Sequence, residues 1–298
     1  MHQANSMGNT LGRAVRCVRR HRPVLLVAVL ILVFFCFSLV SAEGPAGALA
    51  QSAVLATVAV AATALSDARV LALPSRKTAS TIQSDETKLG RWTWYVLTLG
   101  LAAGIAAVVF GGVMPPTVAP AAFGEGIIKV GGGILLCLLT GVFEEGAFRA
   151  VALDALMPAF KPSQHRVLLA ALVSSALFGI LHISMGEVSS LADPIMVAQA
   201  CIKPLQAGLF GLFMAALFMR SRNLWVVAGV HGAFNVLYTG PALLSGVPDT
   251  YVTGSPVDLV LLVATTALLV VPAIVAGKSL LAVEKTQDSS SNKVLLPL

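Results

Sequence analysis

Charged residues are scarce in this chain. Lys, Arg, Asp and Glu make up 11% of its 298 residues, whereas 57% are hydrophobic. Soluble domains carry about twice that share of charge, so this composition cannot cover a water-exposed surface. The 20 basic residues outnumber the 14 acidic ones, but they lie in short clusters between apolar stretches. This distribution argues against nucleic-acid binding and suits the anionic face of a membrane.

Several familiar signatures are also missing. The four cysteines are scattered and show neither metal-binding spacing nor a disulfide framework. The H-E-x-x-H motif of many zinc proteases does not occur in the sequence. There is no internal repeat of fixed period and no sign of the two related halves typical of many transporters. Disulfide-stapled folds and the usual zinc-protease helix are therefore excluded.

Long apolar stretches are what the sequence has instead. A helix crosses the hydrocarbon core in about 20 residues, and eight stretches meet that length: 23–42, 44–66, 92–114, one that starts near 127 and runs into 141–150, 167–186, 196–219, 223–243 and 259–277. We therefore expect an all-α, polytopic membrane protein with about eight transmembrane helices. One transmembrane domain (23–277) would be flanked by a basic N-terminus (1–22) and a polar, disordered tail (278–298).

The positions of the basic residues predict the orientation of the helices. Of the 20 Lys and Arg residues, 18 fall in alternate connections between the apolar stretches, as the positive-inside rule requires. Both termini and the tail are therefore expected in the cytoplasm, and the Ala-rich, weakly charged helices suggest a bacterial plasma membrane. The other two, Lys129 and Lys203, are expected to snorkel toward an interface. The first stretch could instead be a signal peptide cleaved after Val40-Ser41-Ala42, although its length favours an uncleaved helix.

Ionisable residues gather at three places inside or at the end of apolar stretches: EEGAFR at 144–149, FGILH at 178–182 and HGAFN at 231–235. A charge at the bilayer centre costs roughly 2.5–3.5 kcal/mol on insertion scales, so each cluster calls for a reason. Two explanations need no chemistry: the charges could mark a helix end near the membrane interface, and the histidines could form hydrogen bonds that hold helices together.

Helix periodicity predicts how these residues pair, because residues four apart share a face. Glu145 should pair with Arg149, and Phe178 should lie beside His182. Glu144 then remains on a neighbouring face without a local cation.

The same periodicity directs His231 and Asn235 into one groove. Glu144 and His182 each lie 19 residues from Ser163, so an antiparallel hairpin would bring them to one level. That hairpin requires the fourth helix to continue past Arg149. The three clusters would then meet in one cavity.

A carboxylate, two imidazoles and an amide in such a cavity suit the hydrolysis of an acyl bond. Glu144 would be the general base for a water molecule that His182 also holds. His231 and Asn235 would donate hydrogen bonds to the oxyanion. Alternatively, Glu144, His182 and His231 make a plausible zinc set, so zinc remains a possible cofactor.

The three motifs, in this order on successive apolar helices, resemble the E-E-x-x-x-R, F-x-x-x-H and H-x-x-x-N motifs of the CPBP family (CAAX protease and bacteriocin-processing, also called ABI) of intramembrane proteases. The resemblance covers roughly residues 125–245. It implies a CAAX-prenyl-protease-like helix bundle in which Glu144 and His182 activate water and His231 and Asn235 form the oxyanion site. Glu145, Arg149 and Phe178 would support them.

The function expected from this resemblance is an intramembrane endopeptidase. Its substrate would be a membrane-associated protein or peptide, either prenylated and of CaaX type or a leader peptide. Its other partner would be the lipid bilayer, with no nucleic acid. Two alternatives remain open: a proton-coupled transporter, because membrane carboxylates and histidines also form proton relays, and a non-catalytic scaffold or immunity protein.

Overall fold

The computed structural model describes residues 44–75, 87–110, 123–183, 185–240 and 252–294, together with a few single positions. The predicted basic N-terminus (1–22) and the first predicted span (23–42) therefore lie outside the described residues, apart from two isolated positions. Throughout the described part, the regular elements are helices and there is no strand. The predicted all-α class is confirmed.

Seven of these helices are long: α3 (Gly44–Asp67), α5 (Leu89–Phe110), α6 (Phe123–Glu145), α8 (Arg166–Ile180), α9 (Pro194–Ser221), α10 (Leu224–Tyr238) and α12 (Pro256–Val294). Four short elements complete the list: η1 (Ala68–Leu71), η3 (Gly146–Leu153), α7 (Asp154–Leu156) and η4 (Met185–Glu187). Capping side chains mark where two of the long helices begin. The carboxylate of Asp193 accepts from the backbone N–H of Ile195 and Met196 at the start of α9, and the Asn223 side chain accepts from Val226 at the start of α10.

Within the described residues, four helical stretches are long and apolar enough to cross a membrane: Ala46–Leu71, Leu89–Phe110, Pro194–Ser221 and Pro256–Thr286. Each overlaps a predicted span, and the chain is an integral membrane protein by this criterion. Two further predicted spans, 167–186 and 223–243, correspond to apolar helices of only 15 residues, α8 and α10. A total of about eight spans, and the orientation of the termini, stay predictions.

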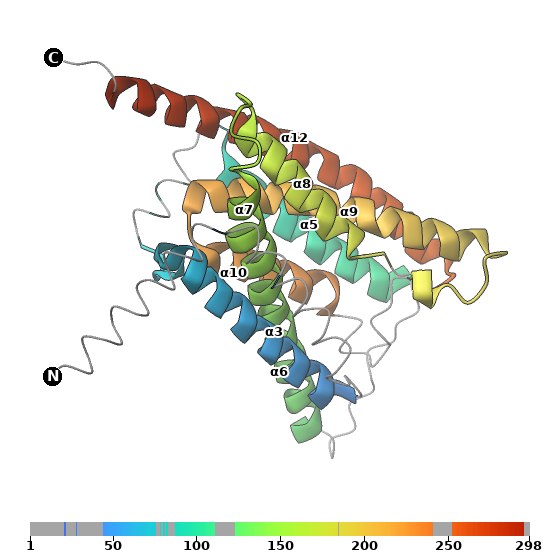
Figure 1. The fold of residues 1–298 in the computed structure, drawn as a ribbon. Coiled ribbons are helices and arrows are strands. Elements are labelled where there is room, and N and C mark those ends of the chain that lie inside the picture. The colour runs from blue at the N-terminus through green and yellow to red at the C-terminus, as the bar shows by residue number, and fades with distance from the viewer. Residues whose placement is uncertain are drawn as a thin grey trace, which may run out of the picture.

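The packing of the helices brings the motif-bearing segments together (Figure 1). Helix α9 packs against α8 on one side and α12 on the other, while α10 packs against α6 and α5. Helix α3 crosses α6 and continues against η3. The ends of α6, α8 and α10, where the three sequence motifs lie, therefore face a common interior.

Two glycines set the close contact between α6 and α10. A Cβ added at Gly141 would lie 2.7 Å from the carbonyl oxygen of Ala228, and one added at Gly232 would lie 2.8 Å from Leu138 Cδ2. Small residues let membrane helices approach this closely. The contact fixes His231, next to Gly232, against the end of α6 that carries the glutamates.

The fourth predicted helix does continue past the glutamates, as the hairpin requires. Helix α6 passes into the π-helix η3 at Gly146 and then into α7, which ends at Leu156. Gly146 allows α3 to approach, since a Cβ there would lie 2.9 Å from Ala59 Cβ. The Ser174 hydroxyl of α8 donates a hydrogen bond to the Phe148 carbonyl at 2.7 Å. Phe148 lies in the π-helix, so this bond gives one of the π-helical carbonyls a side-chain partner. Such π-helical turns occur frequently at functional sites.

The C-terminal helix extends through part of the segment for which the sequence predicts a disordered tail. Helix α12 runs to Val294, and its turns just after the last predicted span are packed, with Leu280 and Glu284 buried. Glu284 Oε1 accepts from the backbone N–H of Val167 at 2.6 Å, at the start of α8. The tail prediction is therefore wrong for these turns, because local polarity did not reveal that this carboxylate caps another helix.

Candidate active site

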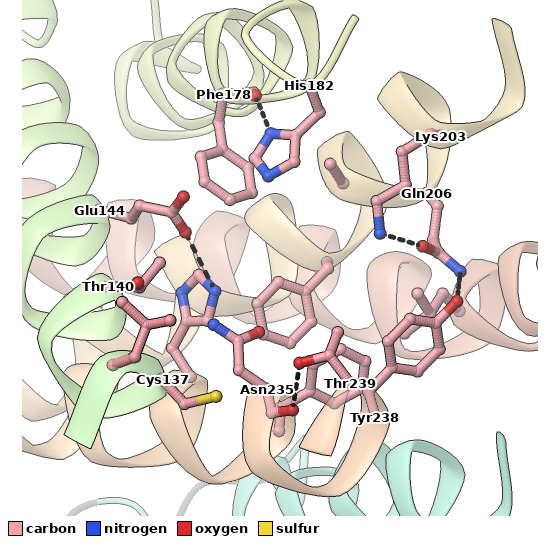
Figure 2. Close-up of a pocket in the computed structure, with 16 residues that line it drawn as sticks. Cys137, Thr140, Glu144, Phe178, His182, Lys203, Gln206, Asn235, Tyr238 and Thr239 are labelled. Carbon is pink, nitrogen blue, oxygen red and sulfur yellow. Dashed lines mark hydrogen bonds and ion pairs between the residues drawn. The ribbon is translucent and has the colours of Figure 1, made fainter. Parts of the chain in front are cut away.

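The catalytic residues predicted from the three motifs line one cavity of about 170 Å³ (Figure 2). Helix α6 contributes Glu144, the turn after α8 contributes His182, and α10 contributes His231 and Asn235. Phe178 also lines the cavity. The structure thus brings these groups together at one cavity, and both Glu144 and His182 lie in its lining.

On one side of the cavity, two carboxylates meet one imidazole. His231 Nδ1 lies 2.7 Å from Glu145 Oε1, and its Nε2 lies 3.2 Å from Glu144 Oε2. The predicted Glu145–Arg149 pair is present as well, with 3.1 Å between Arg149 Nε and Glu145 Oε2. We call Glu144, Glu145, Arg149 and His231 the carboxylate side. Glu144 has no cation on its own helix, as predicted, but its carboxylate contacts His231 of α10, a neighbour that the pattern on one helix could not show.

Arg149 is fully buried and held by more than its carboxylate. Its guanidinium lies over the Phe178 ring, 4.6 Å from the centroid, and its Nη2 donates to the Gly211 carbonyl at 3.3 Å. A side chain at position 211 would crowd that nitrogen, since an added Cβ would lie 3.1 Å from it. Arg149 therefore has a fixed place behind Glu145, away from the cavity lining.

The hydrogen-bond partners of His231 indicate which of its ring nitrogens carry hydrogen. A carboxylate can only accept, so Nδ1 carries hydrogen and donates to Glu145. When Glu144 is ionised too, Nε2 must also carry hydrogen, and the ring is an imidazolium. The two carboxylates, the guanidinium and the imidazolium then sum to zero charge, which lowers the cost of burying them together.

His182 has a different environment. Helix α8 ends at Ile180, and its last turn tightens through hydrogen bonds from His182 N to Gly179 O (2.9 Å) and from Ile183 N to Ile180 O (3.1 Å). His182 Nδ1 lies 2.8 Å from the Phe178 carbonyl oxygen, and its ring meets the Phe178 ring edge-on at 4.6 Å. Because a carbonyl only accepts, Nδ1 donates and Nε2 of the neutral ring is an acceptor.

Asn235 follows His231 by one helical turn and is half-buried in the cavity wall. Its backbone carbonyl accepts from the N–H and the hydroxyl of Thr239, at 2.8 and 2.9 Å. These bonds fix the end of α10. The side-chain amide lies beside the cavity (Figure 2), where it can offer N–H donors.

The predicted zinc set does not fit this geometry. Among the described residues, no three His, Cys, Asp or Glu side chains converge as metal ligands do. Both nitrogens of His231 are directed at carboxylates, whereas a metal-binding imidazole needs a free lone pair on one nitrogen. Both ring nitrogens of His231 instead contact carboxylate oxygens.

The opposite side of the cavity contains polar residues that the sequence analysis did not assign to the site. Lys203 is 7% exposed and lines the cavity with Gln206 and Tyr238; we call these three the lysine side. The snorkelling predicted for Lys203 is wrong, because its ammonium turns inward to Gln206 Oε1 at 2.9 Å. The signal was present in the sequence: Lys203 and Gln206 are three apart on one apolar helix and so share a face.

Comparison with known families agrees with the family that the sequence resembles. The family model "Rce1-like: Type II CAAX prenyl endopeptidase Rce1-like" matches residues 127–237, which include all the motif residues and most of the cavity lining. No curated protein and no solved structure was found to match the chain. The match covers α6 through α10 and confirms the resemblance to this protease family.

Proposed function

We propose that this membrane protein is an endopeptidase that hydrolyses a peptide bond of a membrane-associated substrate, because its residues 127–237 match the family model of Rce1-like type II CAAX prenyl endopeptidases. The observation that carries the proposal is the pair of carboxylates meeting His231 at a cavity shared with His182 and Asn235. A prenylated CaaX-type protein or a leader peptide would be such a substrate.

The first step follows from the different proton states of the two histidines. A water molecule between Glu144 and His182 Nε2 has two acceptors, so it is oriented with its lone pair toward a bound carbonyl carbon. Glu144 takes one proton as the oxygen attacks, which is general base catalysis. The neutral ring of His182 holds the water through the remaining hydrogen.

The second step uses the donors on α10. As Glu144 gains a proton, its attraction for the His231 imidazolium falls, and the Nε2–H can turn to the new oxyanion. The Asn235 amide donates a second hydrogen bond. The tetrahedral intermediate then breaks its C–N bond, and the proton held by Glu144 passes to the leaving amine. Glu145 and Arg149 keep His231 oriented and do not react.

The test is cleavage by purified protein reconstituted in liposomes and supplied with a library of lipidated and unmodified peptides. We expect Glu144→Ala and His231→Ala to abolish the cleavage that the unchanged protein shows, while Lys161→Ala on the exposed turn keeps it. Cleavage that survives both cavity substitutions would overturn the mechanism. An absence of cleavage by the unchanged protein, together with proton-coupled uptake into vesicles, would identify a transporter instead.

A further inference from the structure

Phe210 of α9 lies against the histidine of α10 that meets both carboxylates. Its side chain is almost fully buried and lines the cavity. Its ring meets the His231 ring edge to face, with 4.9 Å between the centroids and 74° between the planes. Aromatic rings attract each other at this separation. Neither the three sequence motifs nor the proposed chemistry assigns a role to this side chain.

Two further rings hold Phe210 in place. It stacks on Phe234 with 4.6 Å between the centroids, and Phe234 stacks on Tyr238 at 5.4 Å. Phe234 is itself closely packed against α5, because a Cβ added at Gly100 would lie 3.0 Å from its Cδ2. His231 and Phe234 are three residues apart and share a face of α10, so the Phe210 ring packs against both from the neighbouring helix.

The same turn of α9 also contacts the arginine behind Glu145. The carbonyl of Gly211, the residue after Phe210, accepts from Arg149 Nη2 at 3.3 Å. Helix α9 therefore supports the carboxylate side at two points, through this hydrogen bond and through the ring contact with His231.

A second phenylalanine of α9 shows what packing alone looks like. Phe213 is fully buried in the hydrophobic core and is not among the residues that line the cavity. Phe210 differs from it by its place in the cavity wall and by its contact with His231. The two residues therefore form a matched pair for separating packing from a role in the site.

The ring contact matters because hydrogen bonds alone leave the imidazole some freedom. Carboxylate oxygens accept over a broad range of directions, so the contacts of His231 with Glu144 and Glu145 leave the tilt of its ring less restricted. In the proposed second step, the bond to Glu144 is released and the bond to Glu145 remains. At that stage the ring packed against His231 determines where Nε2–H is directed.

Phenylalanine combines two properties that this position needs. Its flat ring offers a broad surface that restricts the tilt of a ring packed against it. It also carries no hydrogen-bonding group that could compete with the oxyanion for Nε2–H. Leucine shares the second property and lacks the first, which makes Phe210→Leu the informative substitution.

We propose that Phe210 is a positioning residue, whose ring holds the His231 imidazole so that Nε2–H is directed at the oxyanion. The inference rests on the proposed peptidase function. Phe210 acts through His231 and takes no part in proton transfer, so its loss should slow the chemical step and leave the affinity for substrate unchanged.

The kinetic test compares Phe210→Leu with Phe213→Leu in liposomes. Both variants remove a buried phenyl ring from α9, but Phe213 is outside the cavity lining. We expect Phe210→Leu to lower kcat about tenfold to a hundredfold, as misplacement of a reacting group does, with little change in KM. Phe213→Leu should keep both parameters, and Phe210→Tyr, which retains the ring, should keep most of kcat. An unchanged kcat in Phe210→Leu, a rise in KM alone, or an equal fall in Phe213→Leu would each overturn the proposal.

Nuclear magnetic resonance tests the positioning without requiring turnover. In the detergent-solubilised full chain, the Nδ1–H that His231 donates to Glu145 should give a low-field proton signal that exchanges slowly with water, because the bond is charge-assisted and 2.7 Å long. We expect slow exchange to persist in Phe213→Leu and to be lost in Phe210→Leu. Equal exchange in the two variants would contradict the proposal.

One measurement needs no variant, so it decides the matter even if Phe210→Leu does not fold. The ring protons of Phe210 and His231 should show nuclear Overhauser contacts in the unchanged protein, and their absence would remove the basis of the proposal. The two arms also separate this inference from the proposed function. Cleavage with an unchanged kcat in Phe210→Leu would sink the positioning role and leave the peptidase standing. If the unchanged protein cleaves no peptide, the peptidase fails, and the exchange rates still decide whether Phe210 holds His231.

Discussion

The two sides of the cavity hold buried charge in different ways. On the carboxylate side, two carboxylates, a guanidinium and an imidazole are linked by contacts of 2.7–3.2 Å, and their charges cancel when the imidazole is protonated. On the lysine side, the ammonium contacts an amide oxygen and an aromatic ring. A balanced cluster is stable before the substrate arrives and suits proton transfer, which needs fixed geometry.

The largest expected effect comes from removing one positive charge from the carboxylate side. Arg149→Met removes the guanidinium behind Glu145 and leaves this buried carboxylate with His231 as its remaining partner; breaking a buried ion pair typically costs about 3–5 kcal/mol of stability. We expect a marked fall in the thermal unfolding midpoint of the detergent-solubilised protein, together with loss of cleavage.

The double variant Arg149→Met/Glu145→Gln removes both charges and should recover much of that midpoint. It should not recover cleavage, because His231 would lose the carboxylate that orients it. If the single and double variants unfold at the same temperature, the charges do not compensate each other and the contrast between the two sides fails.

A smaller effect, confined to the chemical step, is expected from Asn235→Ala. Loss of one oxyanion donor typically lowers kcat by about 10² to 10³. The substrate KM should change little, since the oxyanion forms only in the transition state. Steady-state kinetics in liposomes separate the two parameters. A rise in KM with unchanged kcat would place Asn235 in substrate binding and not in oxyanion stabilisation.

The smallest expected effect is that of a chelator. Both nitrogens of His231 are engaged with carboxylates, so we expect activity to survive prolonged treatment with EDTA and metal analysis to find no stoichiometric zinc in the active preparation. Loss of activity on chelation, restored by added zinc, would show that the carboxylate side rearranges around a metal and that its contacts with His231 are not those of the working enzyme.

Contacts within one helix could be predicted from the sequence, whereas contacts between helices could not. Pairs such as Glu145 with Arg149 and Phe178 with His182 lie four residues apart and follow from helix geometry. The contact between Glu144 and His231 depends on the close approach of α6 and α10 at Gly141 and Gly232. A single sequence does not show which glycines meet, so the contact between Glu144 and His231 could not be predicted from helix periodicity.

The lysine side illustrates the same limit. Its bonds join α9 to α10 and α12, and Gln206 and Thr265 are far apart in the chain. Helix ends were equally hard to predict: α8 stops at Ile180 because its last turn tightens, and α12 extends because Glu284 caps α8. The contact at Glu284 joins two helices, and local hydropathy does not reveal it.

The most direct test of the central claim compares Glu144→Gln with Glu187→Gln in H₂¹⁸O, with peptide products identified by mass spectrometry. Glutamine preserves the shape of Glu144 but cannot take a proton, whereas Glu187 lies exposed in η4 and is not among the cavity-lining residues. We predict that the unchanged protein and Glu187→Gln release a product whose new carboxylate carries one ¹⁸O, and that Glu144→Gln slows this release by about 10² to 10⁴. Equal rates of labelled product from both variants would contradict the assignment of Glu144 as the base.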